Sequence, residues 1–80
     1  MDVAEIYRTL TDIFHDVFGD DSISVLPDLT ANDVDEWDSL THIRLILTVE
    51  KAFNVKFSAS EIGKPKKVED LVELIHSKAH

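Results

Sequence analysis

Apolar residues recur at three- and four-residue steps along the first eighteen positions, which is the spacing of one face of an α-helix. Asp2 stands just before this run and can cap the helix, with Glu5 three residues later completing a capping box. Gly19 follows the run and is typical of a helix end. The pattern predicts a helix whose apolar face is Val3, Ile6, Tyr7, Leu10, Ile13, Phe14, Val17 and Phe18.

Residues 20–38 lack sustained periodicity, and Pro27, Asn32 and many aspartates are typical of a loop. The loop is long for a compact domain, and such loops are often functional or mobile. We expect Thr30 to cap a short turn in it. We also expect five apolar side chains to hold the loop against the core: Ile23, Val25, Leu26, Leu29 and Val34.

A second helical pattern begins at about Ser39 and ends at Phe53, before Asn54. Its apolar surface is wide, so a central helix that packs on more than one neighbour is expected. The predicted main stripe is Leu40, Ile43, Ile46, Leu47 and Phe53, widened by Leu45 and Val49.

After Phe57, a short turn over residues 59–62 ends at Gly63, and a last helix carries Val68, Leu71, Val72 and Ile75 at helical spacing. No alternating strand pattern competes with these helices. The chain is therefore predicted to be all-α. Residues 1–80 would form one domain, a small four-helix bundle of three main helices and one short helix, with a long loop between the first two.

Composition excludes several classes of protein. Eighty residues allow a single small core. The chain has no cysteine, which excludes disulfides and Cys-based zinc sites and is compatible with a reducing compartment. No apolar run approaches the roughly 18 residues of a membrane span, and the N-terminal alternation of apolar and charged residues is unlike a signal peptide. A cytoplasmic monomer is expected.

The formal charge of −8 disfavours nucleic acid and anionic membranes as partners. Residues 1–38 hold eleven of the sixteen acids and one base, Arg8, whereas residues 39–80 hold five acids and seven bases. The acidic field is therefore centred on the first helix and on the loop before Ser39. It indicates either a basic protein partner or a solvated surface that aids solubility.

Ser39 follows Asp38 at the first turn of the second helix. The free N–H groups and the macrodipole favour negative charge at that position, so the hydroxyl is well placed to carry an anion. Serine is also a good helix cap, but Asp38 can cap the helix itself and leave the Ser39 hydroxyl free. Trp37, the only tryptophan, is either a core plug or a platform for whatever Ser39 carries.

Other chemistry fits these residues less well. Asp38, Ser39 and His42 lie on one helix turn, so the histidine cannot stand between the serine and an orienting acid as a catalytic triad requires. Residues 28–39 resemble a calcium loop only superficially, because Asp33 stands where glycine is needed and Ser39 where glutamate is needed. The four histidines show no close metal-ligand spacing, so no metal site is predicted, although the acidic loop can attract divalent cations loosely.

The triplet Asp38-Ser39-Leu40 resembles the phosphopantetheine attachment motif of the acyl carrier proteins. The order of elements is also similar to that family: a long acidic helix, a long loop, a helix that begins at the serine, a short helix and a final helix. The similarity covers nearly all of the chain. A bare Asp-Ser-Leu triplet is weak evidence, whereas the triplet at the head of the second helix of such a chain is specific.

The resemblance implies that a separate phosphopantetheinyl transferase esterifies Ser39 with 4′-phosphopantetheine from coenzyme A. The thiol of this covalent cofactor would carry an acyl or aminoacyl group as a thioester, so the chain itself is not an enzyme. Asp38 would help the transferase to engage the serine, and Leu40 would be a buried or contact position. Trp37 would cover the loop and touch the cofactor.

Departures from the family pattern concern partners. Fatty-acid-synthesis carriers usually have glycine and a small residue where Glu36 and Trp37 stand, and their second helix is usually rich in acids. The resemblance therefore implies a specialised carrier, loaded by a ligase or acyltransferase and serving a synthase or transferase of a fatty-acid, polyketide or related pathway. The predicted partner-binding residues are Asp35, Glu36, Thr41, His42, Arg44, Glu50 and Lys51. The alternative is an unmodified acidic helical adaptor that binds a basic partner.

Overall fold

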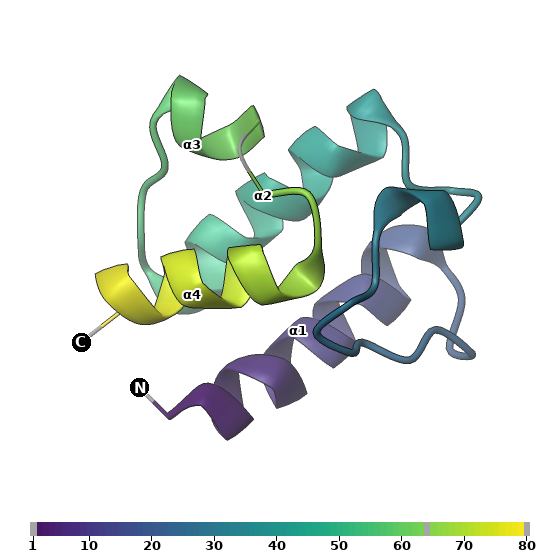
Figure 1. Cartoon of the computed structure of the whole chain (residues 1–80), viewed down its shortest axis with the longest axis horizontal. Coiled ribbons are helices and arrows are strands. Elements are labelled where there is room, and N and C mark those ends of the chain that lie inside the picture. Colours follow the sequence, from purple (N-terminus) through teal and green to yellow (C-terminus); the bar gives the residue numbers. More distant parts are fainter. Residues whose placement is uncertain (1, 64, 80) are drawn as a thin grey trace.

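Four α-helices and one 3₁₀ turn make up the regular structure of the computed structural model, which describes residues 2–63 and 65–79. The helices are α1 (Val3–Phe18), α2 (Ser39–Phe53), α3 (Ala59–Gly63) and α4 (Val68–Lys78), and the 3₁₀ turn η1 spans Ala31–Asp33. Figure 1 shows α1, α2 and α4 as the three long elements, with α3 as a short helix beyond α2. The described residues contain no strand, so the predicted all-α, four-helix fold is confirmed.

Local signals set the ends of the long helices. Asp2 accepts a hydrogen bond from the N–H of Ala4 at 3.1 Å and begins α1. Gly19 ends it in the left-handed region at φ 64°, which costs glycine little because it has no Cβ. Asn54 ends α2 in the same region at φ 55°. These ends agree with the predicted ones because caps depend on residues next to them in sequence.

The core lies where α1 packs against α2 and α4. It is formed by side chains that expose less than 2% of their surface: Ile6, Leu10, Phe14, Leu45, Ile46, Val49, Val68, Leu71 and Ile75. Fully burying one aliphatic or aromatic side chain contributes about 1.5–3 kcal/mol, so these residues dominate the stability of a chain this small. The helices are thus held mainly by packing and less by their own propensity.

The predicted apolar stripe of α2 is partly wrong. Leu45, Ile46, Val49 and Phe53 are buried, but Leu40, Ile43 and Leu47 expose 71%, 52% and 54% of their surface. The two sets lie roughly 140° apart around the helix at 3.6 residues per turn. Because α1 and α4 cover only one side of the helix, the second apolar set remains at the surface.

The long loop is fixed to α4. The N–H of Val68 donates to the carbonyl of Leu29 at 2.9 Å, and the N–H of Glu69 donates to the carbonyl of Pro27 at 2.9 Å. These bonds satisfy N–H groups that the first turn of a helix leaves free. Val25 and Val34 anchor the loop in the core as predicted, whereas Leu26 is 56% exposed and does not.

The short helix α3 contributes no buried residue and depends on contacts with its neighbours. The carboxylate of Glu61 lies 3.1 Å from the ammonium of Lys78 on α4. The carbonyl of Ile62 lies 2.8 Å from Nε2 of His42 on α2. These two contacts hold α3 between the start of α2 and the end of α4.

Candidate functional site

The Ser39 hydroxyl is available for chemistry. Ser39 is the first residue of α2 and its side chain is exposed. Across residues 2–63 and 65–79, its hydroxyl oxygen takes part in no hydrogen bond. The position predicted to carry an anion is therefore open to a second protein.

Asp38 caps the helix in place of the serine. The N–H of Thr41 donates to Asp38 Oδ1 at 2.9 Å, and the N–H of Asp38 donates to Thr41 Oγ1 at 2.8 Å. Bonds from the N–H and then the hydroxyl of Thr41 lower the pKa of the Asp38 carboxyl. Asp38 is thus a carboxylate at neutral pH. Because its pKa is lower in the folded state, its stabilising contribution is present above the ordinary carboxyl pKa and is lost as the pH falls through the lowered value.

Trp37 and His42 form a hydrogen-bonded pair beside this cap. The indole Nε1–H of Trp37 donates to Nδ1 of His42 at 3.1 Å. An indole nitrogen can only donate, so Nδ1 accepts, and the proton of the neutral ring lies on Nε2. Nε2–H then donates to the carbonyl of Ile62 at 2.8 Å. One imidazole thereby connects the segment before Ser39, helix α2 and helix α3.

The Trp37 ring also joins the core. It packs edge-on against Phe14 with ring centroids 5.3 Å apart, and its centroid lies 5.9 Å from that of Phe18. The ring remains half-buried and lines a surface hollow together with Ser39. Trp37 therefore packs into the core, as the first interpretation predicts, and part of its ring lies at the surface next to Ser39; its role as a platform stays a prediction.

Replacing His42 with leucine is expected to reduce the free energy of unfolding. Both hydrogen bonds of the imidazole are lost, at about 0.5–1.5 kcal/mol each. Urea unfolding should show the loss, and the emission of Trp37 should shift because its indole N–H loses its partner. His76→Leu is the control, since the side chain of His76 on α4 is exposed. Equal unfolding midpoints for the two variants would contradict the role of the pair.

Several predicted partner-binding residues have partners inside the protein. Thr41 forms the cap with Asp38, and both ring nitrogens of His42 are engaged. Glu50 is half-buried, and its Oε2 accepts a bond from the N–H of Phe57 at 2.8 Å. Asp35, Glu36, Arg44 and Lys51 are exposed and remain accessible to a partner.

The most accessible apolar surface of α2 was not predicted. Leu40, Ile43 and Leu47 follow one another at three- and four-residue steps, which places them on one side of the helix. Arg44 and Lys51 lie next to them in the same helical projection, and these five residues are called the α2 face below. In the sequence, the only sign of the α2 face was the unusual width of the apolar pattern along this helix.

The structure gives no organised metal site in the part of the chain it describes: it contains no group of three or more His, Cys, Asp or Glu side chains that could hold an ion. Asp33, in the middle of the acidic loop, accepts bonds from the N–H of Thr30 at 3.0 Å and from its hydroxyl at 3.1 Å. Its carboxylate therefore serves the η1 turn.

Millimolar magnesium is nevertheless expected to raise the melting temperature by a few degrees. Eleven acids and one base in residues 1–38 repel one another, and counter-ions that bind the folded form stabilise it by mass action. Calorimetry in magnesium chloride and in sodium chloride of equal ionic strength separates binding from screening. Identical melting curves in the two salts would reject cation binding.

This arrangement is the one that the sequence predicts for a carrier protein. The helices place one exposed serine hydroxyl at a helix start, and the residues around it cap, pack and support it. None of the described helices combines the length and the apolar character needed to cross a membrane.

Comparisons with known proteins agree with this class. The structure matches that of a holo acyl carrier protein from Geobacter metallireducens with a TM-score of 0.84 and 44% sequence identity, over 90% of this chain and 83% of that one. It matches an acyl carrier protein from Thermotoga maritima with a TM-score of 0.84 and 26% identity, over 98% and 91% of the two chains. No protein-family model matches the sequence, and a search of curated proteins finds no match. The 44% identity to the Geobacter metallireducens protein, over 90% of this chain, shows that the chain belongs to the acyl carrier protein family. Members of this family are carriers and not enzymes.

Proposed function

We propose that this chain carries an acyl or aminoacyl group as a thioester on 4′-phosphopantetheine attached to Ser39. The observation that supports this most directly is the exposed, unengaged hydroxyl of Ser39 within Asp38-Ser39-Leu40 at the start of α2. The similarity to a protein described as a holo acyl carrier protein supports the cofactor.

The residues present fit this group. Ser39 supplies a free hydroxyl, and the first turn of α2 supplies a field that favours a phosphate. The capping bonds leave Asp38 in place when the serine is modified, because they run to Thr41 and not to Ser39. When bound, the cofactor supplies a thiol that forms the thioester.

Attachment requires a separate phosphopantetheinyl transferase with coenzyme A as donor. A bond forms between Ser39 Oγ and the pantetheine phosphate, the bond from that phosphate to the nucleotide breaks, and the serine proton is lost. Asp38 would contact the transferase beside the reacting hydroxyl. Intact-mass spectrometry after incubation with coenzyme A and a broad-specificity transferase tests the proposal; an unchanged mass would favour an unmodified adaptor instead.

The α2 face is proposed to bind the loading enzyme, a ligase or acyltransferase, and the downstream synthase or transferase. Three exposed apolar side chains beside two cations suit a partner with an apolar patch next to acidic groups. Asp35 and Glu36, which precede the serine, would contact the same partner at its edge. This charge pattern supports a specialised carrier and not one that serves the general fatty-acid machinery.

A further inference from the structure

Ser39 lies on the wall of a surface hollow of about 430 Å³. Gly63, at the end of α3, and Pro65 and Lys66, which come before α4, line the same hollow. Its volume falls within the roughly 300–1,000 Å³ that is typical of small-molecule sites. Residues distant in sequence thus border an open space next to the hydroxyl.

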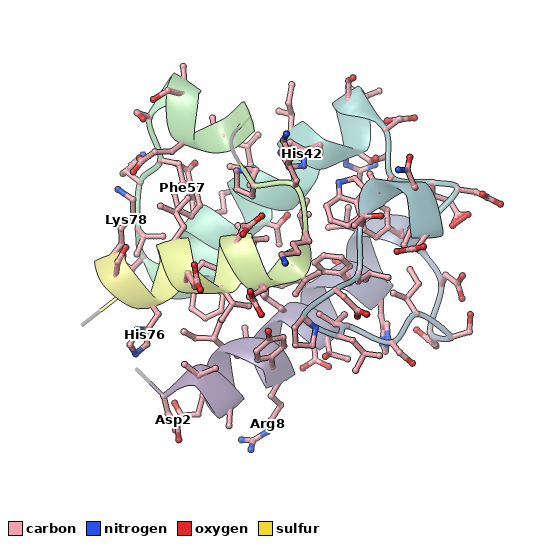
Figure 2. All side chains as sticks on the ribbon, in the orientation of Figure 1. Asp2, Arg8, His42, Phe57, His76 and Lys78 are labelled. Carbon is pink, nitrogen blue, oxygen red and sulfur yellow. The ribbon has the colours of Figure 1, made fainter. Side chains whose placement is uncertain are left out.

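A hydrogen bond connects α2 to α3 beside the hollow. Nε2 of His42 on α2 lies 2.8 Å from the carbonyl of Ile62, the residue before Gly63. Figure 2 shows the His42 side chain beside α3. The hydrogen-bonded rings of His42 and Trp37 both line the hollow, and they lie nearly coplanar, with centroids 6.2 Å apart and an angle of 19° between their planes. The hollow therefore has a fixed wall of two flat rings.

The charges around the hollow are uneven. Asp38 contributes a carboxylate to its edge, so a phosphodiester on Ser39 would place a second negative charge beside the first. Among the described residues that line the hollow, Lys66 is the cation, and its ammonium lies in no ion pair with the rest of the described chain. Lys67, its neighbour, differs in both respects: it is absent from the lining and its ammonium lies 3.8 Å from Glu69.

We propose that Lys66 binds the phosphodiester of a phosphopantetheine on Ser39, and that the first part of the arm lies in this hollow against Trp37 and His42. The inference rests on the attachment at Ser39 proposed above. Lys66 offsets the repulsion between the phosphodiester and Asp38, while the two rings supply an apolar surface for the pantetheine chain. An exposed ion pair contributes little free energy, so the arm exchanges between the hollow and solvent and remains available to enzymes.

The test compares apo and holo forms of the wild type, Lys66→Gln and Lys67→Gln by nitrogen–proton NMR. The two variants lose the same charge at adjacent positions, and both side chains are exposed, so their apo spectra should show intact folds. The probes are the amide of Gly63, which lines the same hollow as Ser39, and the indole N–H of Trp37. Mass spectrometry first establishes whether each sample is modified.

Attachment is expected to shift the Gly63 amide in the wild type and in Lys67→Gln. In Lys66→Gln that shift should be at least about two-fold smaller, the size expected when an exposed ion pair is removed. Raising the salt concentration should reduce the wild-type shift in the same way.

Two failures are distinguishable. Full modification with equal Gly63 shifts in all three proteins, or with shifts confined to residues 38–42, would overturn the role of Lys66 and leave the carrier function intact. A wild type that gains no mass would refute attachment at Ser39 and this inference together.

Discussion

Ser39→Ala will not gain the mass of phosphopantetheine when it is incubated with coenzyme A and a broad-specificity transferase. The wild type is expected to gain one such group under the same conditions. The effect is all-or-none because the variant lacks the only atom proposed to form the phosphodiester. Intact-mass spectrometry of the two proteins measures it.

The fold should tolerate this substitution. Asp38 and Thr41 form the cap through their own atoms, and the serine hydroxyl takes no part in it. We expect the unfolding free energy of the apo variant to stay within about 0.5 kcal/mol of the wild type, as is usual for surface changes of this kind. A lost modification can then be assigned to the hydroxyl and not to unfolding.

Ser24→Ala is the matched control, since it removes another exposed serine hydroxyl from a different part of the chain. It should be modified as fully as the wild type. If Ser39→Ala still gained a phosphopantetheine, the attachment site would lie elsewhere and the proposed role of the motif would be wrong.

The sequence predicted those features that depend on neighbours along the chain. Asp2, Gly19 and Asn54 set helix ends through bonds or backbone angles that involve nearby residues, and α1 and α2 begin and end where expected. The capping role of Asp38 was predictable for the same reason. The family resemblance then indicated a role for Ser39 as an attachment site, which helix propensity alone could not do.

Features that depend on distant residues were not predictable. Which apolar side of α2 is buried depends on where α1 and α4 pack. Periodicity alone therefore placed Ile43 and Leu47 wrongly in the core. His42 looked like a surface residue because its acceptor, the carbonyl of Ile62, lies twenty positions away. Glu50 likewise accepts a hydrogen bond from the N–H of Phe57. Phe57 lies beyond the end of α2, so a projection of that helix does not include it.

Because the α2 face is exposed, reversing a charge on it is expected to affect the binding of partner proteins. Arg44 lies beside Leu40 and Leu47, so a partner that buries those side chains would bring its own charges close to the guanidinium. Interface charges act mainly on encounter rate and on discrimination against wrong partners. A partner with acidic groups would be attracted here, whereas one with a basic surface would be repelled.

Arg44→Glu should therefore slow acyl loading by the enzyme that normally loads this carrier and speed loading by an enzyme of fatty-acid synthesis. The change reverses one charge, and at low salt an effect of about ten-fold is expected, near the lower end of electrostatic steering. Adding Lys51→Glu should enlarge both effects. Loading kinetics at low and high salt measure them, because screening at high salt should bring the rates back toward those of the wild type.

Arg8→Glu makes the same charge change on α1, where the side chain points away from α2 and α4 (Figure 2). It should leave both loading rates close to wild-type values. If Arg44→Glu behaved like Arg8→Glu with both enzymes at low salt, the α2 face would not be the docking surface. The exposed acids before the serine, Asp33, Asp35 and Glu36, would then be the surface to reverse next, since they precede Ser39 in the chain and carry the opposite charge.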